Sequence, residues 1–313
     1  MVRIPLLVAA VATLRPFGRA VRPKSAELDL QPDHVLLAQQ FQRLTPRCQE
    51  QLEGLQRDLM VACQLRESRG HDCNKIVGNI FSGWARPRFF ETLAASDKEA
   101  MLWAGMWDGA GSEPGRTTKQ ALFDFADSVD ADTVHPSSKL GKMVADHGDL
   151  EACNKDPAVY EAFTDSSDNK GLIPNFWNQA SKVFVKGMAN KKQVSVVIVV
   201  NKDLNPQAER SFQKSVLYNY ELPELAREVN WSFEDGDPWH PQVVVVDLKG
   251  TCDEMLKTMK ERIEHTVLNE FWVQKWLKKK PLRCLPCTAP CMLDENFAEK
   301  VKKEFNRKWY HFW

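Results

Sequence analysis

The stretch from Val194 to Val200 reads VSVVIVV, and a second stretch from Gln242 to Leu248 reads QVVVVDL. Both are short, nearly continuous β-branched runs with Lys, Asn, Pro and Gly around them. Strands that are buried on both faces of a parallel sheet have this pattern, because helices cover both of their sides. An amphipathic helix is expected next, from Cys252 to His265. The order strand, connection, strand, helix therefore predicts a small α/β part with a parallel sheet.

Upstream of these strands the apolar residues recur at helical spacing. Helices are predicted at 48–66, 117–128, 156–163 and 174–189. Ser96, Asp97, Lys98 and Glu99 form a capping-box pattern, which predicts a further helix that carries Trp103 inward. The first half of the chain is therefore predicted to be mainly helical.

The predicted fold class is α/β, with a mainly helical N-terminal part followed by a small parallel-sheet part. Tryptophans 272, 276, 309 and 313 gather near the C-terminus, where they are expected to dock a tail onto the body. The predicted segments are a signal peptide at 1–20, a leader at 21–45, a helical lobe at 46–190, an α/β lobe at 191–268 and a Cys- and Trp-rich extension at 269–313.

Composition limits the classes of partner. The chain has 313 residues, and 43% of them are hydrophobic, which is enough for a sizeable core. Because 42 Lys and Arg balance 42 Asp and Glu, no chain-wide basic field attracts nucleic acid. We expect no nucleic-acid partner and a locally recognised ligand instead.

The first 20 residues predict the compartment. A positive Arg3, an apolar stretch over 4–14 and the small-residue pattern at Gly18 to Ala20 are typical of a secretory signal, so we expect a secreted or lumenal protein. A mitochondrial presequence is the alternative, because four arginines precede the first acidic residue, Glu27. The apolar stretch is too short to span a bilayer, which predicts a mature chain without a membrane span.

Eight cysteines form an even set, which in an oxidising lumen predicts disulfides, without fixing their pairing. The close group Cys284, Cys287 and Cys291 leaves a zinc site as the alternative, although no fourth ligand is near in sequence. Asn230, Trp231 and Ser232 form a glycosylation sequon, which predicts a glycoprotein with this segment in a surface loop.

Three segments resemble the ADP-ribosyl cyclase family of NAD glycohydrolases. They read MLWAGMWD at 101–108, FWNQAS at 176–181 and SVLYNYELP at 215–223, and they follow the order of that family. The resemblance implies a transferase and hydrolase that cleaves the nicotinamide–ribose bond of NAD or NADP to give cyclic ADP-ribose or ADP-ribose. It implies no metal or second cofactor, and a cleft between the helical and α/β parts. A homodimer is left open.

The resemblance gives roles to four residues. Glu221 matches the catalytic glutamate, whose charge stabilises the oxocarbenium-like ribosyl cation. Trp103 and Trp177 match the two tryptophans that stack on the cationic nicotinamide ring. Ser181 matches a serine that contacts the ribose or phosphates. Without the resemblance, Glu221 is an ordinary surface acid in a loop, both tryptophans are core residues, and Ser181 is a solvated helix serine.

One loop departs from the family. Where the family has Thr-Leu-Glu-Asp-Thr, this chain has Ala-Leu-Phe-Asp-Phe at 121–125, so Phe123 stands on the glutamate that contacts nicotinamide, and Asp124 follows it. A register shifted by one puts Asp124 on that glutamate instead. The direct register also places Asp132 on a second acid near the nicotinamide amide. With Phe123 and the apolar Val216 we expect a drier pocket that favours cyclisation over hydrolysis.

Two other classes of function compete with the enzyme. A secreted non-catalytic homologue that binds a nucleotide or a protein partner is favoured by the altered acidic loop. An unrelated helical α/β protein with structural Trp and Cys requires three ordered motif matches to be accidental.

Overall fold

The protein is described by a computed structural model, which describes residues 46–66, 73, 98–105, 110–116, 118–133, 172–208, 211–268 and 270–306. The predicted signal peptide, the leader, the helix at 156–163 and the last tryptophans lie outside these residues.

A five-stranded sheet forms the centre of the described chain. Its order is β2-β1-β3-β4-β5, and every pair is parallel. The strands are β1 (Glu99–Ala104), β2 (Ala131–Asp132), β3 (Ser195–Val200), β4 (Gln242–Asp247) and β5 (Arg283–Pro286). The predicted α/β class with a parallel sheet is confirmed.

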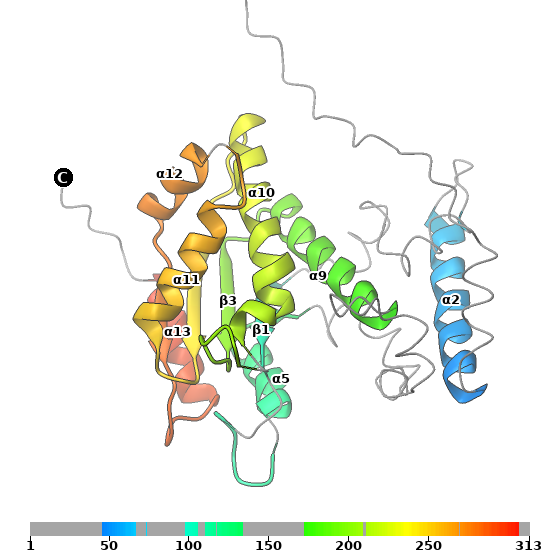
Figure 1. Cartoon of the computed structure of the whole chain (residues 1–313), viewed down its shortest axis with the longest axis horizontal. Coiled ribbons are helices and arrows are strands. Elements are labelled where there is room, and N and C mark those ends of the chain that lie inside the picture. Colours follow the sequence, from blue (N-terminus) through cyan, green and yellow to red (C-terminus); the bar gives the residue numbers. More distant parts are fainter. Residues whose placement is uncertain are drawn as a thin grey trace, which may run out of the picture. The chain divides into compact units, whose positions relative to one another are not determined.

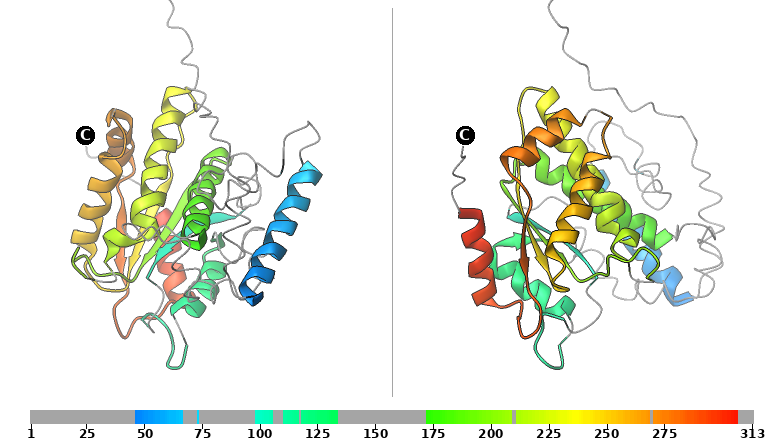
Figure 2. Two further views of the ribbon diagram at one scale, coloured as in Figure 1. Left: turned by 45° about the vertical axis from the view of Figure 1, so that its right-hand side comes forward. Right: turned by 60° about the vertical axis from the view of Figure 1, so that its left-hand side comes forward.

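Helices cover both faces of this sheet (Figures 1 and 2). Side chains of α5 (Thr118–Ser128) and α13 (Glu295–Asn306) pack on one face. Those of α9 (Leu172–Asn190), α10 (Leu222–Glu234), α11 (Cys252–Glu264) and α12 (Phe271–Lys279) pack on the other. Successive strand residues point to opposite faces, and helices cover both faces of the sheet. All six residues of β4 are therefore buried, as the near-continuous valine run predicts.

Most of the predicted elements are confirmed. The structure has helix α2 at Pro46–Arg66, helices α5, α9 and α11, and strands β3 and β4 within two residues of their predicted bounds. Trp276 docks α12 as expected, because its buried ring donates from Nε1 to the Pro241 carbonyl oxygen at 2.9 Å.

The predicted helix after Ser96 is wrong. Residues Glu99–Ala104 form strand β1, which pairs with β2 on one side and β3 on the other. Glu99 does not cap a helix, since its Oε2 accepts a hydrogen bond from the Ser195 backbone N–H at 2.8 Å. A local capping pattern stabilises a helix by about 1 kcal/mol, whereas this short apolar segment is buried between two strands, so tertiary packing decides its structure. Trp103 therefore lies on a strand.

The sheet draws strands from the helical lobe, the α/β lobe and the C-terminal extension alike. Disulfides join Cys252 to Cys284 and Cys287 to Cys291, so the zinc alternative for the close group is excluded by their pairing. Cys48 and Cys73 are also disulfide-bonded. In the chain-entropy view the first bridge, whose cysteines are 32 positions apart in the sequence, stabilises the fold by about 3.7 kcal/mol.

The predicted surface loop at the sequon is wrong as well. Asn230 lies in α10, its side chain is buried, and its Nδ2 donates to Glu234 Oε1 at 2.8 Å. The helix turns Asn230 inward, so this residue is not an accessible acceptor in the folded protein. Among the described helices, none has the length and apolarity needed to cross a membrane.

Candidate functional site

The connections of the sheet change direction between β1 and β3. From β1 the chain runs through α5 on one face to β2, whereas from β3 it runs through α10 on the other face to β4. Loops that depart to opposite faces leave an opening at the carboxyl ends of the two strands, which is where open α/β sheets bind ligands. The topology therefore places a candidate site at this edge.

The chain passes this edge with a close backbone contact. The Asn201 backbone N–H, just after β3, donates to the Ala104 carbonyl oxygen at 2.9 Å. Gly105 follows with φ of 87°, and a Cβ there would lie 2.1 Å from the Asn201 carbonyl oxygen. Only glycine fits this position. This requirement was not among the predictions from the sequence, although the glycine directly after the Trp103 segment is its signal.

A π-helical turn brings Glu221 to the same edge. The turn η2 (Leu217–Glu221) contacts β1 and α9 and continues into α10, where Pro223 is tolerated in the first turn. Arg262 of α11 holds the turn, because its Nε donates to the Tyr218 carbonyl oxygen at 3.0 Å. The predicted loop around Glu221 is therefore helical. Single π-turns are frequent at functional sites.

Glu221 is a buried carboxylate with fewer hydrogen bonds than its two oxygen atoms can accept. Its side chain accepts a hydrogen bond from Ser181 of α9, while its Oε2 has no hydrogen-bond partner among the described residues. Burial raises the pKa of Glu221 from 4.5 to about 7, and the hydrogen bond from Ser181 acts in the opposite direction. A carboxyl with such a pKa near the carboxyl ends of parallel strands is typical of a catalytic group.

The second acid of the same motif has a different environment. Glu224, one turn further along α10, is equally buried but pairs with Lys186 at 3.5 Å and with Arg227 at 3.1 Å. Its charge is compensated by these two cations. Of the two buried acids in this motif, Glu221 is the one that lacks a cationic partner among the described residues.

Of the two predicted site tryptophans, only Trp103 has a described side chain. Trp103 lies near the carboxyl end of β1, and its partly buried ring packs on the α5 side of the sheet, whereas η2 packs on the α9 side. Trp103 and Glu221 therefore approach one edge from opposite faces. Trp177 lies one turn before Ser181 on α9, and its side chain is outside the described residues.

The residues of the altered loop lie on α5 and β2. Phe123 is partly buried and packs on the same side of the sheet as Trp103. Asp124 is exposed and forms an ion pair with Arg116. It lines a separate cavity of about 330 Å³ between the 111–116 loop and the start of α13. Asp132, on β2, pairs with Ala100 of β1, about 10 Å along the strand from Trp103.

Val216 precedes η2 and is partly buried. Of the predicted site residues, the structure joins Glu221 and Ser181 by a hydrogen bond and sets η2 against the strand that carries Trp103. It sets Asp124 apart from them, beside Arg116.

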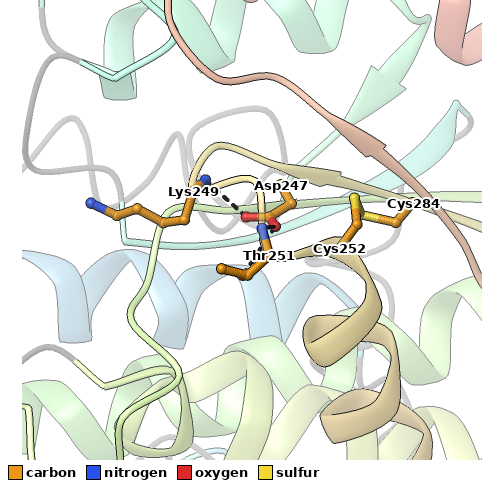
Figure 3. Close-up of a disulfide and its surroundings, with 5 residues drawn as sticks. All are labelled: Asp247, Lys249, Thr251, Cys252 and Cys284. Carbon is orange, nitrogen blue, oxygen red and sulfur yellow. Dashed lines mark hydrogen bonds between the residues drawn. A yellow bond between two sulfur atoms is a disulfide. The ribbon is translucent and has the colours of Figure 1, made fainter.

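A further buried carboxylate lies at the end of β4 (Figure 3). Asp247 is fully buried, and its Oδ1 accepts from the Lys249 backbone N–H at 2.9 Å. Its Oδ2 accepts from the backbone N–H and the hydroxyl of Thr251. Asp247, Cys252 and Cys284 lie close enough together to suggest metal ligands, but the two sulfur atoms are bonded to each other. Asp247 therefore shapes the β4–α11 turn, and sequence analysis did not single it out.

Comparisons of the chain with protein-family models, with curated proteins and with solved structures find no match.

Proposed function

We propose that the chain cleaves the nicotinamide–ribose bond of NAD or NADP, with Glu221 as the catalytic residue. The observation that carries this proposal is the state of Glu221, which is buried, has no cationic partner among the described residues and leaves Oε2 without a hydrogen bond there. An anion in a poorly solvated pocket gains most when a cation forms next to it. A ribosyl oxocarbenium ion is such a cation.

In the proposed reaction the C1′–N bond breaks, and its electron pair leaves with neutral nicotinamide. The ionised Glu221 carboxylate stabilises the positive ribosyl group that remains, as carboxylates do in glycoside cleavage. Ser181 keeps the carboxylate oriented and favours its ionised form, because its hydroxyl donates to it. Water or the adenine ring then forms the new bond to C1′, which gives ADP-ribose or cyclic ADP-ribose.

We propose that the substrate binds at the carboxyl ends of β1 and β3, beside the Glu221 turn, and not between two separate lobes. Asp124 forms an ion pair with Arg116 on the exposed side of α5, away from Glu221. This pairing supports the direct register of the altered loop, in which Phe123 rather than Asp124 aligns with the family's glutamate. Phe123 and Trp103 then supply apolar surface on the α5 side. We propose cyclisation as the favoured outcome, since an apolar wall excludes water and offers adenine a stacking surface.

The proposed enzyme is secreted and requires no cofactor. The disulfides support an oxidising compartment, because such bonds persist in secreted proteins and are rare in reducing ones.

The direct test is incubation of the purified full chain with NAD and, in parallel, with NADP. Chromatography separates nicotinamide, ADP-ribose and cyclic ADP-ribose, and we expect nicotinamide to be released in equal amount to the sum of the other two. Absence of nicotinamide release contradicts the enzyme. If NAD then binds without being cleaved, as measured by calorimetry, the non-catalytic nucleotide-binding homologue is the better function.

A further inference from the structure

Large apolar side chains face solvent at the start of helix α12 and just before it. Leu268 is fully exposed and Phe271 is 59% exposed. The neighbouring Trp272 is only partly buried, because its ring stacks on Phe233 of α10 with a centroid distance of 4.7 Å. Exposed apolar groups that gather at one place mark an interaction surface more often than scattered ones do.

Lysines follow on the same helix. Lys275, Lys278 and Lys279 are all exposed. The Lys275 ammonium lies 4.8 Å from the centroid of the Trp272 ring and 5.8 Å from that of Phe271. We call Leu268, Phe271, Trp272, Lys275, Lys278 and Lys279 the α12 patch.

Glu270, the acid that directly precedes α12, has partners. Glu270 accepts from Gln274 at 3.0 Å and faces His265 at 3.4 Å. Asp237 pairs with Lys192 at 3.1 Å. The lysine charges also act on His240, whose ring packs edge-on against that of Phe233 with a centroid distance of 4.5 Å. Burial first, and then the charges of Lys279, Lys280, Lys275 and Lys192, lower the pKa of His240.

We propose that the α12 patch docks the protein onto the surface of a membrane that contains anionic lipids. The apolar tip formed by Leu268 and Phe271 fits the boundary between headgroups and acyl chains, where aromatic rings are favoured. The lysines that follow fit the negative surface potential of such a membrane, and their aliphatic stems can lie along it while the ammonium groups reach the phosphates. An acidic protein would complement the charges but leaves the exposed Leu268 and Phe271 without a reason.

This surface lies away from the candidate site. Phe233, which stacks on the patch, lies 12 residues after Glu221 along one helical segment, a separation of about 18 Å. Helix α10 runs from the carboxyl edge of the sheet to its amino edge, where α12 lies (Figure 1), so α12 and the Glu221 turn are at opposite edges. Docking therefore does not cover the candidate site, and the inference is independent of the proposed reaction.

The test is flotation of the purified protein with vesicles of phosphatidylcholine, with and without phosphatidylserine. We expect binding only with phosphatidylserine, and weaker binding at higher salt. Because each lysine near such a surface contributes about 1 kcal/mol, Lys278→Gln with Lys279→Gln should weaken partitioning by about 30-fold. Leu268→Ser with Phe271→Ser should weaken it by at least about tenfold, because both side chains lose apolar burial.

Matched controls lie on other helices. Lys257→Gln with Lys303→Gln makes the same charge change at exposed positions of α11 and α13, and Val61→Ser removes an exposed apolar group from α2. These variants should bind vesicles as the wild type does. A thermal melt of each variant checks that it is folded.

The proposal is overturned by wild-type protein that does not bind phosphatidylserine vesicles, or that binds neutral vesicles equally well. It is also overturned if the patch variants bind no more weakly than the controls. Retention on an acidic polymer such as heparin, unchanged by Leu268→Ser with Phe271→Ser and without any vesicle binding, points to an acidic macromolecule instead.

Discussion

Two buried carboxylates lie at the carboxyl edge of the same sheet but differ in how many of their oxygen atoms accept hydrogen bonds. Asp247 at the end of β4 receives hydrogen bonds on both of its oxygens, from Lys249 and Thr251. Glu221 beside β1 receives one from Ser181, and its Oε2 has none among the described residues. A disulfide lies directly next to Asp247, whereas the Glu221 turn is a single π-helical one.

The difference shows how a fold separates a structural acid from a chemical one. A carboxylate whose lone pairs are filled by nearby backbone groups stabilises its own turn and has little capacity to bind anything else. A carboxylate that is buried without full compensation destabilises the protein until a cation approaches it.

Replacement of Glu221 by Gln should reduce NAD turnover by about 10³-fold, because the variant keeps the shape of the side chain but removes the charge next to the ribosyl cation. Nicotinamide release under saturating NAD measures this. The control is Glu228→Gln, which changes another buried glutamate of α10, two turns further along. Near wild-type turnover of the Glu221 variant contradicts its catalytic role.

The same Glu221→Gln change should stabilise the protein, and only above acidic pH. The pKa of Glu221 is about 7 in the folded chain and 4.5 as its ordinary value, so below about pH 4 both states carry the proton and nothing is lost. As the pH rises from 4.5 to 7 the folded state is progressively penalised, by about 3 kcal/mol in all. The gain of the variant in denaturant melts should therefore be absent near pH 4 and complete near pH 8. A gain that is independent of pH refutes the assignment.

Replacement of Asp247 by Asn should have the reverse effect, which is a loss of stability without a loss of turnover. The amide cannot accept on both sides, so the Thr251 donors lose an anionic partner and the free energy of unfolding should fall by about 2 kcal/mol. Turnover per folded molecule should remain that of the wild type. If activity is lost while stability is retained, Asp247 takes part in the chemistry and does not have a purely structural role.

The sequence predicts the strands of the sheet more completely than it predicts the contacts of the candidate site. The valine runs of β3 and β4 predict buried parallel strands, because only such strands are apolar on both faces. The strand β1 could not be predicted, since its six residues follow a helix-capping pattern and become a strand only through pairing with β2 and β3. The bond between Ser181 and Glu221 joins residues 40 positions apart and depends on how α9 packs against η2. The resemblance named both residues, but it predicted a substrate contact for Ser181 rather than this one.

Ser181→Ala should then act on activity through Glu221. The hydroxyl favours the ionised carboxylate, so its removal should raise the pH at which kcat/KM reaches half of its plateau. At a pH below that point, activity should fall by about fivefold, the equivalent of one hydrogen bond of 1 kcal/mol, while the plateau at high pH is retained. Ser128→Ala on α5, whose hydroxyl donates to the Asp124 carbonyl oxygen at 2.9 Å, is the matched control. An unshifted profile means that Ser181 has only a packing role.

The smallest effect is expected on the opposite face of the sheet, where Phe123 packs together with Trp103. Phe123→Glu replaces an apolar wall by a hydrated carboxylate, so water should compete better with adenine for the ribosyl carbon. The ratio of cyclic ADP-ribose to ADP-ribose should fall by about threefold, which corresponds to less than 1 kcal/mol between two transition states, while nicotinamide release continues. Phe123→Leu keeps the wall apolar and should keep the ratio. Asp124→Asn breaks the ion pair with Arg116 on the exposed side of α5 and should also leave the ratio unchanged. If Asp124→Asn changes the products and Phe123→Glu does not, the shifted register of this loop is the right one, and the acid rather than the ring faces the substrate.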